Sequence, residues 1–268
     1  MTMNPRRIAA VFLRYWFLLT RTPQRFFQII IWGALDVILW GFITKYLATL
    51  GVANFGVLSA FLGGAVFLDF IARAHQGTST PALEDIWSNN LFNYFASPLR
   101  IGEYILGLVA ASIFTSTVSV TVMVVMAFLI FGFSITALGP PLFGFLLILF
   151  IFGVSLGILG VTIVLRFGPS GEWYVWPMTA LLSPFVGVFY PISVLPEWMQ
   201  SIALALPPSY VFEGMRSIIL NGTFDLSTLF IGGVLSIVYV VVAYVIFLKV
   251  YKSVVRSGLL AHHSAEGL

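Results

Sequence analysis

Few side chains in this chain could carry chemistry, and their types exclude several kinds of site. None of the 268 residues is Cys, so disulfides, thiolate metal sites and cysteine nucleophiles are excluded. The three His are His75, His262 and His263, and the last two belong to a polar tail. We therefore expect no metal site. The acids are scattered along the sequence rather than clustered, so we expect no catalytic residue either.

Asp36 stands out among the acids because it lies in the apolar stretch WGALDVILW. A charge at the middle of a membrane costs at least a few kcal/mol unless it is paired, protonated or hydrated. Two interpretations remain open. Asp36 either faces a polar cavity or is a buried carboxyl group that is hydrogen-bonded to a neighbouring helix.

Two acid–base pairs have the spacing of local ion pairs. Asp69 lies four residues before Arg73, and Glu213 lies three residues before Arg216. Residues three or four apart are neighbours on a helix surface. We expect both pairs to form, and a gating role is a second interpretation for Glu213 and Arg216.

The segment EDIWSNNLFNYFASPLR, residues 84–100, is unusually polar for its surroundings. Thr80 can cap a helix whose first position is Pro81, and Pro98 ends it. Apolar residues recur every four positions, and an acidic, amide-rich face lies elsewhere. Helices that float on the anionic inner leaflet usually carry Lys or Arg instead. A helix over 80–96 that contacts a protein partner is therefore the favoured interpretation.

Composition places these residues in a membrane protein. The chain is 60% hydrophobic and 9% charged, with a mean hydropathy of +1.04, whereas soluble domains are about 25% charged. A spanning helix needs about 20 apolar residues. We expect an all-α integral membrane protein forming one domain over residues 1–268. Its six transmembrane helices are expected at Phe26–Leu47, Asn54–Ala72, Ile101–Phe133, Leu142–Phe167, Trp173–Tyr190 and Leu226–Tyr251.

The basic residues predict the orientation of these spans. With six spans, eleven of the thirteen Lys and Arg fall on one side, and only Lys45 and Arg216 fall on the other. Cytoplasmic loops carry the excess of positive charge. Both termini and the 80–96 helix are therefore predicted to be cytoplasmic.

Residues 5–20 fit an amphipathic helix at the membrane interface. Arg7, Arg14 and Arg21 are seven apart and fall on nearly one face. We expect these arginines to lie among lipid head groups. The alternative is that this segment is simply the basic flank of the first span.

Prolines mark the other unusual region. Pro177, Pro184 and Pro191 are seven apart, which would place them on nearly one face of the fifth span. Such a face should meet protein or water, because lipid cannot satisfy the carbonyls that proline leaves free. Residues 191–222 are predicted to form two outer half-helices, Pro196–Leu206 and Ser209–Leu220. The alternative is one badly broken seventh span, which would violate the charge rule.

Two motifs in this order resemble a known family. The stretch SPLRIGEYILG resembles part of the cytoplasmic loop of ATP-binding-cassette permeases of the type-2 exporter family. The stretch FYPISVLPEWMQSIALALPPSYVFEGMRSIIL resembles that family's signature near the C-terminus. The six-span order also fits, so the resemblance covers essentially the whole chain.

The resemblance implies roles for particular residues. The 80–96 helix would be a coupling helix that docks on an ATPase, and residues 191–222 would be a re-entrant outer gate. The reasoning from the residues themselves adds that Asp36 and the prolines of span five would line the translocation path, namely Pro177, Pro184 and Pro191. The coupling residues would be Glu84, Asp85, Trp87, Ser88, Asn89, Leu91 and Phe92, and the gate residues Pro196, Glu213 and Arg216.

The resemblance also implies partners. Two ATPase subunits would bind ATP and Mg, since no G-x-x-x-x-G-K-[ST] motif occurs in the sequence and no cofactor is expected in this chain. A second permease copy, as a homodimer, and membrane lipids are expected, and no nucleic acid. The setting would be a bacterial or archaeal inner membrane.

The short loop RFGPSGEW favours an exporter of lipids, drugs or other amphipathic molecules over one of lipid-linked polysaccharides. An ion-driven secondary transporter would need inverted repeats and several ionisable residues within the membrane. A lipid-modifying enzyme would need clustered acids or histidines at one membrane face. Neither pattern is seen in this sequence.

Overall fold

A computed structural model describes residues 3–51, 55–88, 90, 93–94 and 97–257. Over these residues the chain is helical and contains no strand. The long helices are α1 (Pro5–Arg21), α2 (Pro23–Thr49), α3 (Phe55–Trp87), α5 (Ile101–Phe131), α6 (Pro141–Phe167) and α11 (Leu226–Ser257). The shorter ones are η1 (Ile135–Leu138), η2 (Gly168–Gly171), α7 (Glu172–Val175), α8 (Met178–Leu182), η3 (Ile192–Val194), α9 (Glu197–Ala205) and α10 (Pro207–Asn221).

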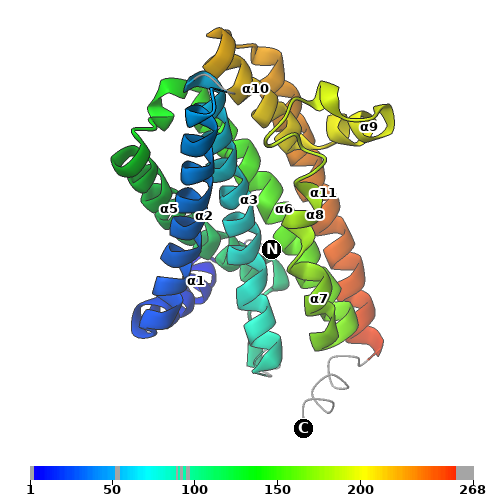
Figure 1. The fold of residues 1–268 in the computed structure, drawn as a ribbon. Helices are drawn as coiled ribbons and strands as arrows, with labels where there is room; N and C mark the ends of the chain where they lie inside the picture. Colours follow the sequence, from blue (N-terminus) through cyan, green and yellow to red (C-terminus); the bar gives the residue numbers. More distant parts are fainter. Residues whose placement is uncertain (1–2, 52–54, 89, 91–92, 95–96, 258–268) are drawn as a thin grey trace.

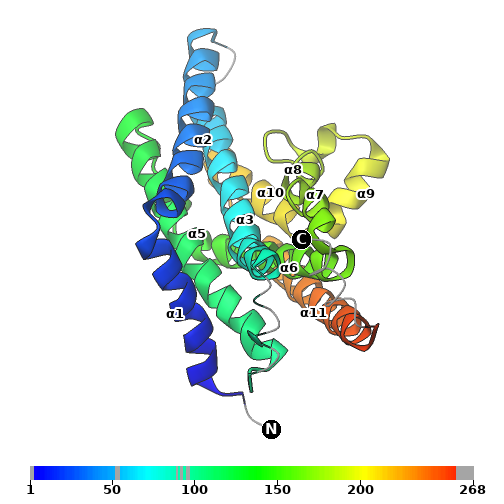
Figure 2. The same cartoon turned by 90° about the horizontal axis from the view of Figure 1, so that it is seen from below.

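The long helices form a bundle whose ends are built differently. In Figure 1, α2 and α5 rise to the upper end, and α3, α6 and α11 descend from it. The segment that contains α7 and α8 climbs again, and α9 and α10 lie at the upper end. Helix α1 lies across the lower part of the bundle (Figure 2).

Four stretches are long and apolar enough to cross a membrane. They are Pro23–Thr49, Ile101–Phe131, Pro141–Val175 and Leu226–Ser257. These stretches contain the first, fourth and sixth expected spans and all but the last two residues of the third, Ile101–Phe133. Large apolar side chains on the outside of the bundle, such as Phe143 at 77% exposure and Leu129 at 74%, suit contact with lipid.

The prediction that the fifth span forms one helix is wrong. Over Trp173–Tyr190 the structure has the short helices α7 and α8 and then turns. Pro177 stands before α8, Pro184 lies in the turns and Pro191 precedes η3. Each proline removes a backbone donor and clashes with the preceding turn. The three prolines therefore do not share one helical face.

The break expected before Thr80 is also wrong. Helix α3 continues without a break from Phe55, within the second expected span, to Trp87, with Pro81 inside it. The helix survives because neighbours hold it on both sides. A Cβ on Gly77 would lie 2.9 Å from Ser112 Cα of α5, and a Cβ on Gly157 of α6 would lie 2.5 Å from Thr78 Cβ. Tertiary packing thus overrides the local start signal.

Close packing of α3 on α6 forms the centre of the core. Gly153 and Gly157 allow it, as the G-x-x-x-G pattern indicates. A Cβ on Gly153 would lie 2.8 Å from the carbonyl oxygen of Ile71. Fully buried phenylalanines, among them Phe67, Phe145 and Phe152, fill the space around this contact.

Candidate functional site

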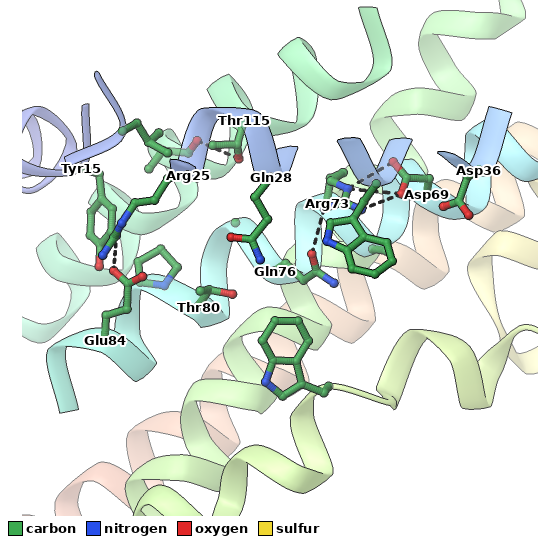
Figure 3. Close-up of a pocket in the computed structure, with 17 residues that line it drawn as sticks. Tyr15, Arg25, Gln28, Asp36, Asp69, Arg73, Gln76, Thr80, Glu84 and Thr115 are labelled. Atoms are coloured by element: carbon green, nitrogen blue, oxygen red, sulfur yellow. Dashed lines mark hydrogen bonds and ion pairs between the residues drawn. The ribbon is translucent and has the colours of Figure 1, made fainter. Parts of the chain in front are cut away.

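A cavity of about 570 Å³ opens between the long helices on the side of α2. Figure 3 shows polar side chains along its whole length. Its lining comes from α1, α2, α3 and α5, together with Trp176 just after α7. The lining residues are Tyr15, Leu19, Arg25, Gln28, Trp32, Asp36, Asp69, Ala72, Arg73, Gln76, Gly77, Thr80, Pro81, Glu84, Ala111, Thr115 and Trp176.

Helical spacing explains why these residues meet at one surface. On α2 the lining residues follow one another at intervals of three or four, as on one face of a helix. On α3 the same spacing runs from Asp69 through Arg73, Gln76 and Thr80 to Glu84. The two stripes face each other, so the polar surface is continuous from the lower end of the bundle to Asp36 (Figure 3).

One end of the cavity holds an ion pair with several hydrogen bonds. Arg73 Nη2 lies 2.9 Å from Asp69 Oδ1, and Arg73 Nε donates to both oxygens of Asp69 at 3.2 Å. Ser119 donates to Asp69 Oδ2 at 3.3 Å, and Arg73 also donates to Gln76. The expected Asp69–Arg73 ion pair is confirmed, and the two charges neutralise each other.

The other end holds a second pair. Arg25 Nη1 lies 2.6 Å from Glu84 Oε2, and the two side chains are 35% and 27% exposed. This contact joins the start of α2 to the end of α3. Tyr15 lines the same end, and burial together with the charges of Asp85 and Glu84 raises the pKa of its hydroxyl well above the usual range.

Asp36 differs from these acids. It is partly exposed and lines the cavity, and it makes no hydrogen bond or ion pair with any residue that the structure describes. Of the two interpretations open for it, the geometry matches the cavity-facing one. Asp36 lies near the Asp69–Arg73 pair, as Figure 3 shows.

Asp85 corrects the expectation of an acidic face turned to a partner. Its side chain is fully buried. Arg14 Nη1 donates to Oδ1 at 2.5 Å, and the Tyr104 hydroxyl donates to Oδ2 at 2.8 Å. Burial lowers the pKa of Arg14, but the hydrogen bond and charge of Asp85, together with the nearby Tyr15 and Tyr104, offset this, so the pKa of Arg14 is raised. Asp85 therefore binds its own chain.

Arginines of α1 are also placed differently from the lipid-facing arrangement expected. Arg14 pairs with Asp85, and Arg7 lies 3.4 Å from buried Glu103 and donates to the carbonyl of Pro98. Arg21 lies over the Phe17 ring on the exposed side. The expected helix over 5–20 is confirmed as α1, but Arg7 and Arg14 make their contacts within the protein.

The remaining coupling residues are placed only in part. Trp87 ends α3 with 46% of its surface exposed, and Ser88 is exposed beside it. Asn89, Leu91 and Phe92 lie outside the described residues. The lower tip of α3 thus presents an aromatic side chain rather than free carboxylates.

The expected outer gate residues form a clamp. Arg216 Nη1 lies 2.8 Å from Glu213 Oε1, which confirms this ion pair. Arg216 Nη2 donates to the carbonyls of Gly187 and Tyr190 at 2.6 and 3.1 Å, and Glu213 accepts from the Ile192 amide at 2.8 Å. Helix α10 therefore holds the broken segment before α9. Pro196 is exposed and precedes α9.

Two groups of residues differ from the site that the sequence predicted. Pro177, Pro184 and Pro191 do not line the cavity, because their segment is not one helix. Sequence reasoning missed the lining residues Arg25, Gln28, Trp32, Gln76, Thr80 and Trp176. The signal for most of them was the helical spacing of polar residues in 25–36 and 69–84. Within the described residues, no group of three His, Cys, Asp or Glu could hold a metal.

Comparison with known proteins adds one match. The family model described as ABC-2 type transporter matches residues 7–220, which is most of the chain and includes α1 through most of α10. No curated protein matches the chain.

Proposed function

The chain belongs to the ABC-2 type transporter family, and from this premise we propose that it is an exporter permease that moves an amphipathic molecule, such as a lipid or a drug, out of the cytoplasm. The family supports the broader statement that the chain is the membrane-spanning permease subunit of an ABC transporter. The observation that carries the proposal is the polar cavity within an apolar helical bundle. Its volume of about 570 Å³ lies in the range of sites for drug-sized molecules.

ATP hydrolysis would be supplied by a separate ATPase subunit that docks at the lower tip of α3. Trp87 and Ser88 are exposed there, and a large exposed aromatic residue is a typical anchor of a protein interface. Arg14 and Arg25 connect the same tip to α1 and α2. Movement of the docked subunit would therefore reach the α2 side of the cavity.

The assembly would contain two copies of this chain and two ATPase subunits. The chain would cross a bacterial or archaeal inner membrane six times with both termini in the cytoplasm. The four stretches long and apolar enough to cross a membrane support a multi-pass protein, and the basic residues near the start of α2 and the end of α11 support a cytoplasmic position for both. The clamp of Glu213 and Arg216 would belong to an outer gate.

The test is to co-express the tagged chain with a P-loop ABC ATPase from the same genome and to measure co-purification and ATP-dependent uptake into inside-out vesicles. We expect the ATPase to co-elute and a panel of labelled lipids and drugs to reveal cargo uptake. Trp87→Ala should weaken co-elution. Trp198→Ala is the control, because it alters an aromatic residue of 62% exposure in α9. This substitution should leave co-elution unchanged. Absence of both co-elution and ATP-dependent uptake would contradict the proposal.

A further inference from the structure

The charges that line the cavity do not balance. Its lining contains two arginines and three acids, namely Arg25, Arg73, Asp36, Asp69 and Glu84. Arg25 pairs with Glu84 and Arg73 pairs with Asp69. Asp36 is therefore the one lining acid that forms no ion pair with a lining arginine. Its carboxylate makes the end of the cavity beside Asp36 negatively charged.

Asp36 has aromatic and polar neighbours that suit an amphipathic ligand. Trp32 lies one helical turn before it on the same face of α2, and both residues line the cavity. Trp32 is 54% exposed and Trp176 is 47% exposed, so both offer ring surface. Gln28, Gln76 and Thr80 line the middle of the cavity with groups that can hydrogen-bond (Figure 3).

We propose that this cavity binds an amphipathic molecule with one positive charge, which is placed against Asp36 and the indole of Trp32. An unpaired carboxylate within the membrane is costly, and a cationic ligand supplies the missing counter-charge. Indole rings attract cations through their faces and pack against apolar groups. An anion of the same size would meet an uncompensated negative charge. This inference rests on the proposed function, since it gives the substrate class for that cavity.

The matched ligands for the test are tetraphenylphosphonium and tetraphenylborate, which share shape and size and differ in the sign of their charge. Binding to the full chain in nanodiscs is measured by calorimetry without ATP or an ATPase, with protein-free nanodiscs as the blank. We expect tetraphenylphosphonium to bind at least about tenfold more tightly than tetraphenylborate, from one ionic contact at partial exposure.

Variants assign this preference to Asp36. Asp36→Asn should weaken tetraphenylphosphonium binding by about tenfold, and Asp36→Glu should retain most of it. Asp225→Asn alters an exposed acid outside the cavity and should bind like the wild type. If Asp36→Asn does not fold, the difference in binding of the two ions to the wild type still tests whether the cavity prefers a cation. Equal binding of both ions, or wild-type binding by folded Asp36→Asn, would overturn the proposal.

Two sources of such a ligand are possible, a lipid with a cationic head group and a soluble organic cation. Adding a trimethylammonium lipid to the nanodisc suppresses tetraphenylphosphonium binding if the site takes lipids, and has no effect if it takes soluble cations. Both outcomes support a cationic ligand and identify its source. Because this assay needs no ATPase, a failed vesicle experiment with intact cation binding would refute the proposed export and not the site.

Discussion

Arg14 of α1 donates to Asp85 of α3 at 2.5 Å, across 71 residues of sequence. The same carboxylate accepts a hydrogen bond from the Tyr104 hydroxyl, whose oxygen lies 2.8 Å from Asp85 Oδ2. One buried acid therefore joins α1, α3 and α5 at the lower end of the bundle. The exposed Trp87 follows it by two residues, so the proposed docking tip is held in place by a network inside the chain.

Asp85→Ala should destabilise the protein much more than Glu84→Ala. Loss of the buried carboxylate leaves the buried Tyr104 hydroxyl and the partly buried Arg14 without their acceptor, and such unsatisfied groups cost about 1–3 kcal/mol each. The partly exposed pair of Glu84 and Arg25 should contribute less than about 1 kcal/mol. Unfolding of the two purified variants in detergent measures the difference. Equal, small effects would contradict the role of Asp85 as a structural junction.

Gly157→Ala should destabilise the contact of α3 with α6. The new methyl group would lie 2.5 Å from Thr78 Cβ and 2.9 Å from the carbonyl oxygen of His75. Forcing a group into a close-packed contact costs about 1–3 kcal/mol. Gly233→Ala on α11 is the matched control, because nothing lies within 4 Å of its added Cβ. Thermal unfolding in detergent compares them, and similar midpoints would rule out a tight contact at Gly157.

Glu213→Ala should loosen the segment before α9. It removes the acceptor of the Ile192 amide and the counter-ion of Arg216. Leaving such groups unsatisfied costs about 1–3 kcal/mol. Hydrogen exchange at Ile192 should therefore become faster.

Glu197→Ala is the control for this clamp, because Glu197 is an exposed acid of the same region whose side chain makes no hydrogen bond to a described residue. In the assembled complex, Glu213→Ala should also change cargo flux or its coupling to ATP hydrolysis. Unchanged exchange, flux and coupling would together exclude a gate that depends on this clamp.

Ser88→Cys and Asn221→Cys should be labelled from opposite sides of the membrane. Ser88 follows α3 and Asn221 ends α10, and both are exposed. These ends lie at opposite ends of the bundle (Figure 1). The chain has no native Cys, so a membrane-impermeant maleimide reports each site cleanly. Labelling of both from the same side would disprove the proposed topology.

Much of the architecture could be predicted because it depends on local properties. Apolar length marks α2, α5, α6 and α11, and residue spacing indicates the ion pairs Asp69–Arg73 and Glu213–Arg216. The failures have physical causes as well. Pro81 reads as a helix start, but contacts with α5 and α6 keep it inside α3. The three prolines of residues 177–191 follow a helical spacing, yet they prevent the helix that the spacing requires.

By itself the sequence determined that this is a helical membrane protein with one unusual intramembrane acid, because hydropathy and charge are properties of residues. Only the tertiary structure decided which charges are satisfied. Asp85 looked available to a partner and is buried against Arg14, whereas Asp36 looked equally able to be buried and instead lines a cavity without a counter-ion. A charge is neutralised by whichever group the fold brings within a few ångströms, and those groups come from helices far apart in the sequence.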